Sequence, residues 1–457
     1  MNKKALFYFI LFFSIYCLFC LINILDQFTI ECFIWICLKI IITFWILRKL
    51  FIKSFYSFSL EKIFYIFIFM FFLVAPVSQY FNNIVLWDAN KNHHTIESYL
   101  YADVLLMLFL ICFSYGMIKA RSKRKLKRPL NKSHNLTNSL SLFIILTVLH
   151  TLVFSWFYIN IGFPEMLFRK TNLIEIGSAS QSFGLVTSKY LKSFSVAIIF
   201  ILIGNLKNKD FLKKSIVYLN LIIFFLMYFP TSAARFQIIG VFLGLFLFVN
   251  KDSLSKHVIS NSLIIGLFIV LPILSVFRHV TDFGVINISI INKSLSRGYS
   301  NGDFDTYQMF VNCISCVHNT GVTYGHQLLA VFLFFVPRSI WPDKPFGSGH
   351  EVANLNSLNF NNLSMPIIGE GYINFGVTGV IIFGFIFGYF CFKYDRYFWS
   401  NSNRNTIFIH FYYVFIGYFF FMNRGDLLSS VAFSVALFLA FATVHMISKV
   451  FFLNRHN

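Results

Sequence analysis

The sequence predicts an all-α polytopic membrane protein with about twelve transmembrane helices. Hydrophobic residues make up 57% of the 457-residue chain, aromatic residues 20% and charged residues only 12%. A soluble chain of this length could not bury so much apolar surface. The apolar residues also fall into runs of roughly 17 to 25, the length of a helix that crosses a bilayer. We therefore treat residues 1–457 as a single integral membrane domain.

Apolar runs place the expected spans along the chain. The first, near residues 5–25, follows two lysines as a signal peptide would. It lacks a small-residue cleavage site, so we expect it to be retained. The other spans are expected near residues 28–47, 63–80, 99–118, 140–160, 185–204, 215–231, 235–250, 258–277, 371–392, 406–422 and 427–448.

Basic residues in the connecting loops predict the orientation of these spans. Lys and Arg cluster within residues 48–62, 119–132, 207–214 and 393–404, and all of these loops fall on one side of the membrane. Since cytoplasmic loops carry the excess of Lys and Arg, we expect this side, and both termini, to be cytoplasmic. Membrane topology thus explains the net charge of +20, and we expect no nucleic-acid partner.

One large segment, residues 278–365, separates the ninth and tenth expected spans and is predicted to lie outside. Within it, residues 325–336 are apolar but too few to cross the membrane before Pro337. If they did cross, the basic loops of the last three spans would face outward. We therefore expect a re-entrant or interfacial helix here. Because long loops usually carry function, and irregular backbone at membrane depth usually lines a cavity, we expect the chemistry in this segment.

Cations on the expected outer side are the first candidate binding residues, because short outer loops are normally poor in Lys and Arg. Guanidinium groups bind diphosphate through paired hydrogen bonds, which suits a lipid-linked diphosphate at the membrane boundary. Such a cation could instead anchor its helix at the interface by reaching lipid phosphates. Arg424 could also simply pair with Asp426. The candidates are Arg235, which follows a tight turn and begins an apolar helix, and Arg278, Arg297, Arg338, Lys344 and Arg424.

Acids and imidazoles on the same side are candidate proton carriers. Glu370 lies at the outer end of the tenth expected span, where partial loss of water would suit it to act as a general base. It could equally satisfy the free amides at the start of that helix. His326 and His350 are the histidines nearest Pro337, although a lone histidine is more often structural than catalytic.

The sequence predicts neither a metal site nor a cofactor. Cys313 and Cys316 have C-x-x-C spacing, but a second pair and a nearby ligand histidine are missing. His93 and His94 lie near two acids without the spacing of a standard metal site. Motifs typical of zinc proteases, α/β-hydrolases, NTPases and dinucleotide-binding domains are also absent.

Two segments resemble the signatures of the Wzy-type O-antigen polymerases. Residues 336–345 read VPRSIWPDKP, and residues 369–379 read GEGYINFGVTG. They are similar to that family's recurrent P-R-x-x-W-P-x-K-P and E-x-Y-x-N-F-G-x-x-G patterns. The likeness is close over residues 326–376 and elsewhere extends only to architecture.

The resemblance implies a glycosyltransferase of the bacterial inner membrane that acts at its periplasmic face. Such an enzyme joins undecaprenyl-diphosphate-linked oligosaccharide units into O-antigen or a related surface polysaccharide. Its partners would be that lipid-linked donor, membrane lipids and a polysaccharide chain-length regulator. The candidate cations would bind the donor diphosphate. Glu370, or else His326 or His350, would deprotonate the acceptor hydroxyl, and Trp341 and Tyr372 would contact the sugars.

Two other functions share several of these features. An O-antigen ligase would use the same kind of donor but would transfer the polysaccharide to the lipid A core. A flippase for the lipid-linked unit would need charged or broken helices at mid-membrane depth. The expected spans hold few ionisable residues, and most of these could reach an interface, which favours the polymerase. The ionisable residues include Glu31, Lys39, Lys189 and Lys192.

Overall fold

The computed structural model is all-helical over the residues that it describes. These are 3–26, 29–53, 56–88, 94–122, 139–167, 179–206, 210–230, 235–251, 255, 259–266, 298, 301–402 and 406–453. Within these ranges, eight helices are long and apolar enough to cross a membrane. The prediction of an all-α polytopic membrane protein is therefore confirmed. The expected span near residues 258–277 lies mostly outside the described ranges, so the number twelve stays a prediction.

The membrane-spanning candidates follow the expected apolar runs closely. Two of them contain π-helical turns, η1 and η2, which continue the preceding α-helix. The eight candidates are α1 (Lys3–Asp26), α2 (Ile30–Leu47) with η1 (Arg48–Ile52), α3 (Leu60–Ile68) with η2 (Phe69–Val74) and α4 (Ala75–Phe81), α5 (Ile96–Ser122), α6 (Leu140–Ile161), α8 (Ala179–Gly204), α16 (Ile367–Asn401) and α18 (Leu427–Leu453).

The remaining elements are shorter. Three of them, α9, α10 and α17, coincide with expected spans. These elements are α7 (Phe163–Leu167), α9 (Phe211–Met227), α10 (Arg235–Val249), the 3-10 turn η5 (Gly302–Phe304), α13 (Thr306–Thr320), α14 (His326–Phe332), α15 (Ser348–Leu355) and α17 (Ile407–Arg424).

Glycines allow the closest helix contacts of the bundle. In the pair α5 and α16, a Cβ at Gly388 would lie 2.0 Å from the carbonyl oxygen of Phe113. A Cβ at Gly116 would lie 2.1 Å from that of Phe385. In the pair α10 and α17, a Cβ at Gly417 would lie 2.2 Å from the Gly240 carbonyl oxygen. Backbones approach this closely in membrane bundles where small residues replace bulky ones, because association there depends on van der Waals packing.

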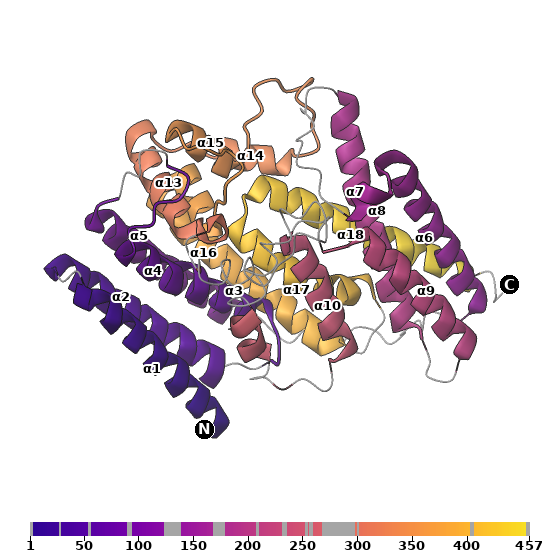
Figure 1. The fold of residues 1–457 in the computed structure, drawn as a ribbon, viewed down its shortest axis with the longest axis horizontal. Helices are drawn as coiled ribbons and strands as arrows, with labels where there is room; N and C mark the ends of the chain where they lie inside the picture. Colours follow the sequence, from indigo (N-terminus) through magenta and orange to yellow (C-terminus); the bar gives the residue numbers. More distant parts are fainter. Residues whose placement is uncertain are drawn as a thin grey trace.

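One end of the bundle is covered by a helical layer, residues 301–366, which we call the cap. It comprises η5, α13, α14 and α15, which lie together beside the start of α16 (Figure 1). The Tyr307 hydroxyl donates to the Tyr99 carbonyl of α5 (3.1 Å), and the Gln79 amide donates to the Phe304 carbonyl (2.9 Å). The described part of the expected large loop is therefore an ordered set of short helices packed on the bundle.

The apolar stretch that the sequence predicts to be too short to cross the membrane forms α14 and the turn after it. Leu329, Phe332 and Phe335 are exposed along this stretch. A short helix with exposed apolar side chains agrees with the expected interfacial helix and excludes a full span here.

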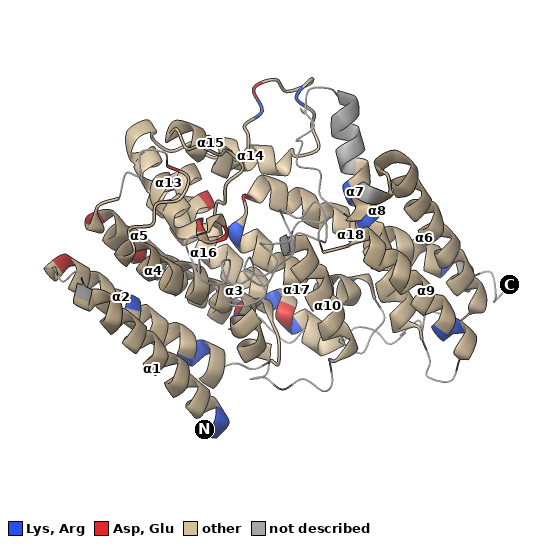
Figure 2. Ribbon diagram, in the orientation of Figure 1, with Lys and Arg blue, Asp and Glu red and all other residues tan. Residues whose placement is uncertain are grey.

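The opposite end of the bundle is basic. Lys49 and Lys62 lie close to Glu61 at the start of α3, and Arg396 of α16 lies close to Tyr56. Lys and Arg also occupy ends of α1, α2 and α9 that point away from the cap (Figure 2). The two ends of the molecule thus differ in charge as well as in structure.

Candidate functional site

The second of the two resembling segments, at the start of α16, packs against the residues that lead into the first. The Leu328 amide of α14 donates to Asn374 Oδ1 of α16 (3.1 Å). The Thr323 amide donates to the Ile373 carbonyl (2.9 Å). The helical geometry of α16 breaks at Phe375 and Gly376, and Gly376 has a φ of 61°, which favours glycine. The first turns of α16 therefore hold the start of α14, and with it the chain leading to Pro337.

Glu370 is buried where α15, α16 and α18 meet, with 1% of its surface exposed. Its Oε2 accepts a hydrogen bond from the Ser348 hydroxyl of α15 (2.7 Å). Its Oε1 accepts the amide of Leu427, the first residue of α18 (2.8 Å). The sequence left open a structural role at a helix start, and the structure shows such a role at α18, since free amides at a helix N-terminus favour a carboxylate.

A second carboxylate, Asp426, lies beside Glu370. It accepts the Ser429 amide (2.8 Å) and the Ser429 hydroxyl (3.1 Å), as a residue that caps α18 would. Burial raises the pKa of Asp426 above its ordinary value. Gly347 lies directly against it, since a Cβ there would be 2.8 Å from the Asp426 carboxyl carbon. The cap therefore covers a pair of neighbouring carboxylates.

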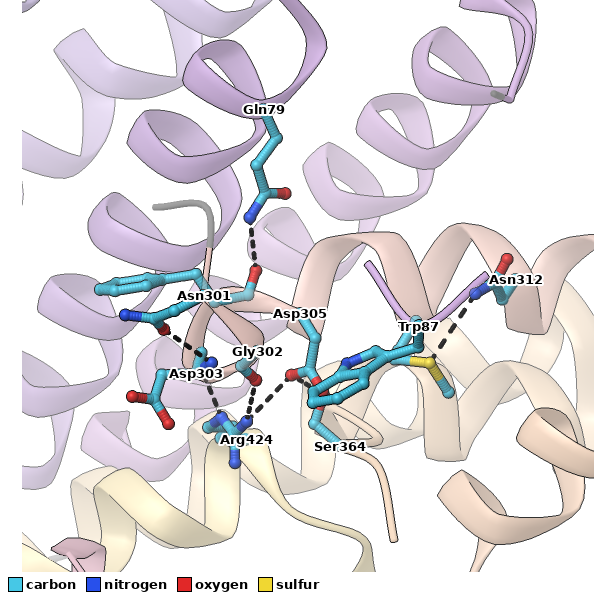
Figure 3. Close-up of polar contacts among 11 residues, drawn as sticks. Gln79, Trp87, Asn301, Gly302, Asp303, Asp305, Asn312, Ser364 and Arg424 are labelled. Carbon is cyan, nitrogen blue, oxygen red and sulfur yellow. Dashed lines mark hydrogen bonds and ion pairs between the residues drawn. The ribbon is translucent and has the colours of Figure 1, made fainter. Parts of the chain in front are cut away.

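Arg424, at the end of α17, joins the cap to the bundle (Figure 3). Its guanidinium donates to the carbonyls of Gly302 and Asp303 and to Asp305 Oδ1, each at 3.0 Å. The pairing with Asp426 that the sequence left open is wrong, because the carboxylate paired with Arg424 is Asp305. Much of the hydrogen-bonding capacity of Arg424 thus serves the attachment of the cap.

Asp305 accepts hydrogen bonds from two further parts of the chain. Its Oδ2 accepts the indole N–H of Trp87 (3.1 Å), from the connection between α4 and α5. Its Oδ1 accepts the Ser364 hydroxyl (2.6 Å), from the segment before α16. Figure 3 shows these side chains converging on Asp305 and Arg424. This carboxylate therefore fixes the cap to the bundle.

The two cations of the Pro337 segment have different environments. Lys344 is buried, with 8% of its surface exposed, and its ammonium donates to the carbonyls of Phe334 and Val336 (both 2.8 Å). Burial and the nearby Arg338 lower the pKa of Lys344. Arg338 is exposed, donates to the carbonyls of Lys344 and Pro345, and lies 3.8 Å over the Phe346 ring. The Lys344 side chain therefore stabilises the loop in which it lies. The Arg338 guanidinium is fixed by its contacts but stays exposed at the surface.

Two pairs of aromatic and imidazole rings lie in the same part of the cap as Arg338, and one of them includes the Phe346 ring that Arg338 contacts. The ring of His326 lies 6.1 Å from that of Trp341, and the ring of His350 stacks on Phe346 at 4.5 Å. His350 Nδ1 also accepts the Asn354 amide (3.0 Å). We call Arg338, Trp341, Phe346, His326 and His350 the cap surface. It combines one fixed cation with flat apolar rings, which suits a ligand that carries both phosphate and sugar.

Four other sequence candidates do not join the cap surface in the described structure. Tyr372 is buried and faces Phe310 of α13, with ring centres 6.5 Å apart. Arg235 begins α10, but its side chain lies outside the described residues, as do Arg278 and Arg297 entirely. Their predicted role in binding diphosphate stays a prediction.

The sequence did not predict a buried ion pair between α2 and α5. Lys39 of α2 and Asp103 of α5 lie 2.9 Å apart with both side chains 0% exposed. The Tyr307 hydroxyl oxygen of α13 lies 3.0 Å from the same Asp103 oxygen, so its one proton is shared between Asp103 and the Tyr99 carbonyl. The expectation that such residues reach an interface is therefore wrong for Lys39. Asp103 is the residue that could have revealed this pair in the sequence, because an acid inside an apolar span needs a partner.

Metal ligands do not cluster in the part of the chain that the structure describes, where no group of three or more His, Cys, Asp or Glu could hold an ion. Cys313 and Cys316 are both buried. The Cys313 thiol contacts the Gly369 carbonyl (3.7 Å), and burial raises its pKa well above the ordinary value, which disfavours a thiolate ligand. Cys313 therefore packs α13 against the start of α16, whereas Cys316 contacts Thr320 within α13.

Comparison of the chain with family models, with curated proteins and with solved structures finds no match.

Proposed function

We propose that the protein is a glycosyltransferase that joins oligosaccharide units carried on undecaprenyl diphosphate into a surface polysaccharide. The observation that carries this proposal is the cap surface, where Arg338 is exposed, held by backbone carbonyls and stacked on the Phe346 ring. Asn374 bonds to α14, the helix that leads to Arg338, and it lies in the part of α16 that bears Glu370. The two motifs of the resemblance thus belong to one structural unit.

Charge at the two ends of the bundle supports an outer location for the cap in a bacterial inner membrane. Lys49, Lys62 and Arg396 lie at the end away from the cap, where the positive-inside rule expects the cytoplasm. With that orientation both termini are cytoplasmic and the cap is periplasmic. A donor outside the cytoplasm arrives already activated, as a lipid diphosphate does.

Arg338 suits the donor diphosphate. Two backbone carbonyls and the Phe346 ring hold its guanidinium, and N–H groups remain for phosphate oxygens because the side chain has five donors in all. The exposed apolar residues of α14 would rest at the lipid surface, near the depth at which the carrier diphosphate emerges. Positive charge held there stabilises the diphosphate as it leaves.

Glu370 suits the role of general base in this reaction. The acceptor hydroxyl attacks the anomeric carbon, the bond from that carbon to the diphosphate oxygen breaks, and the electron pair leaves with the diphosphate. The hydroxyl proton passes to a carboxylate. Ser348 already donates a hydrogen bond to Glu370 at 2.7 Å, so an acceptor hydroxyl that replaced it would lie within reach of the base.

A carrier for the lipid-linked unit is favoured less. It would need charged groups at mid-membrane depth along a path for the substrate. The Lys39 and Asp103 side chains are charged groups at such a depth, but both are fully enclosed. We therefore interpret the pair of Lys39 and Asp103 as a structural feature of the proposed transferase.

The test is polymer length in a deletion strain complemented with variants at matched membrane abundance. Arg338→Ala is expected to reduce long polymer at least tenfold, because one charge-assisted contact contributes about 1.5 to 3 kcal/mol. Arg48→Ala removes an exposed arginine at the opposite end and should leave the polymer unchanged. Single repeat units on the lipid A core identify a lost polymerase, and polymer retained on the carrier identifies a lost ligase.

Full-length polymer from both Arg338→Ala and Glu370→Gln would eliminate the proposed site. Normal polymer in the deletion strain itself would eliminate the function.

A further inference from the structure

A long apolar groove runs along α17 between α16 and α18. Its volume is about 680 Å³. On α17 its lining extends from Phe408 to Met422, roughly 20 Å at about 1.5 Å per residue. Phe390 of α16 and Phe438 of α18 form its sides. The shape and lining fit a hydrocarbon chain that lies parallel to the helices.

A second groove lies between α16 and α5. Its volume is about 370 Å³, and Tyr115, Phe385, Ile386 and Tyr389 line it together with Lys119. It is shorter than the first groove and equally aromatic. The second half of α16 therefore borders both grooves.

Each groove carries a lysine at the basic end of the bundle. Lys393 lines the first groove and its ammonium lies 5.5 Å from the centre of the Tyr389 ring. Lys119 lines the second groove and lies 5.3 Å from the centre of the Tyr115 ring. Among the described residues, neither ammonium has a carboxylate partner. Tyrosine and lysine together are typical of the level at which phospholipid head groups lie.

We infer that the two grooves bind the hydrocarbon chains of anionic phospholipids, with Lys393 and Lys119 contacting their phosphates. Charge complementarity selects this occupant, since an ammonium held over a ring at the mouth of an apolar groove lacks an anion. A lysine over a tyrosine ring recurs at both grooves, once on α16 and once on α5. The sites lie at the end away from the cap, so this inference is independent of the proposed glycosyl transfer.

The test uses the full chain, purified in detergent and stripped of lipid, and native mass spectrometry to count bound lipids. Phosphatidylglycerol should bind in preference to phosphatidylcholine with the same acyl chains. Lys393→Ala and Lys119→Ala should each weaken phosphatidylglycerol binding about fivefold, the effect of one cation near an anionic lipid surface. Phosphatidylcholine binding should stay unchanged.

Matched variants separate the charge from the groove. Val435→Phe fills the first groove without changing charge and should lower the number of bound lipids, whereas Lys393→Arg should keep the preference for phosphatidylglycerol. Lys213→Ala is the control, because Lys213 also lies over a ring, that of Phe143, but pairs with Asp210 outside both grooves. Equal binding of the two lipids, or unchanged binding in both alanine variants and in Val435→Phe, would overturn the inference.

Discussion

Glu370 and Asp395 lie near opposite ends of α16, and each is a buried carboxylate at the start of another helix. Glu370 accepts the amide of Leu427 in α18, and Asp395 accepts the amides of Leu60 (2.8 Å) and Glu61 (3.3 Å) in α3. Asp395 also accepts the Tyr412 hydroxyl of α17. The same arrangement thus joins helices at both ends of the molecule.

The two acids differ in what else they contact. The partners of Asp395 all belong to bundle helices, so its bonds hold α3, α16 and α17 together. Glu370 is bonded to Ser348 of the cap and lies beside the carboxylate of Asp426. A buried acid at a helix start is therefore not evidence of catalysis by itself. Asp395 also has a second carboxylate nearby, that of Glu61, so the bond to the cap is what distinguishes Glu370.

The largest effect is expected for Asp395→Ala. It leaves two buried amides and a phenol without their acceptor, at about 1 to 3 kcal/mol for each group. The thermal midpoint in detergent should fall strongly, and little folded protein should be recovered. Asp395→Asn keeps an acceptor oxygen and should recover part of the loss. A thermal midpoint for Asp395→Ala equal to that of the wild type would contradict the structural role.

An intermediate effect is expected where the cap joins the bundle. Arg424→Ala should destabilise the protein by about 2 to 3 kcal/mol, because it removes charge-assisted bonds to Asp305 and to cap carbonyls. Asp305→Asn should lower the stability less in the Arg424→Ala protein than in the wild type. A double-mutant cycle on the thermal midpoint measures this coupling. Additive losses would show that the pair at 3.0 Å contributes no coupling of its own.

The sequence predicts the apolar helices well, because their length and composition are local properties. It predicts for the same reason that α14 is too short to cross a membrane, since few residues precede Pro337. The partners of buried charges were not predictable. Leu60 and Asp395 are 335 residues apart in the chain. Neither the burial of Lys344 nor the Lys39–Asp103 pair follows from residue type, because tertiary packing alone brings their partners within reach.

The smallest effect on stability is expected when only the charge of a buried carboxylate is removed. This change should also give the clearest difference between the two ends of α16. Glu370→Gln keeps an oxygen for the Leu427 amide, so we expect a loss of about 1 kcal/mol. A carboxamide cannot take up a proton as a base, so long polymer should disappear although the protein stays folded. Asp395→Asn makes the same chemical change at the basic end and, at matched abundance, should still produce polymer. If both variants lose polymer in proportion to their thermal midpoints, Glu370 has only the structural role of Asp395, and the base must be sought among Asp426, His326 and His350.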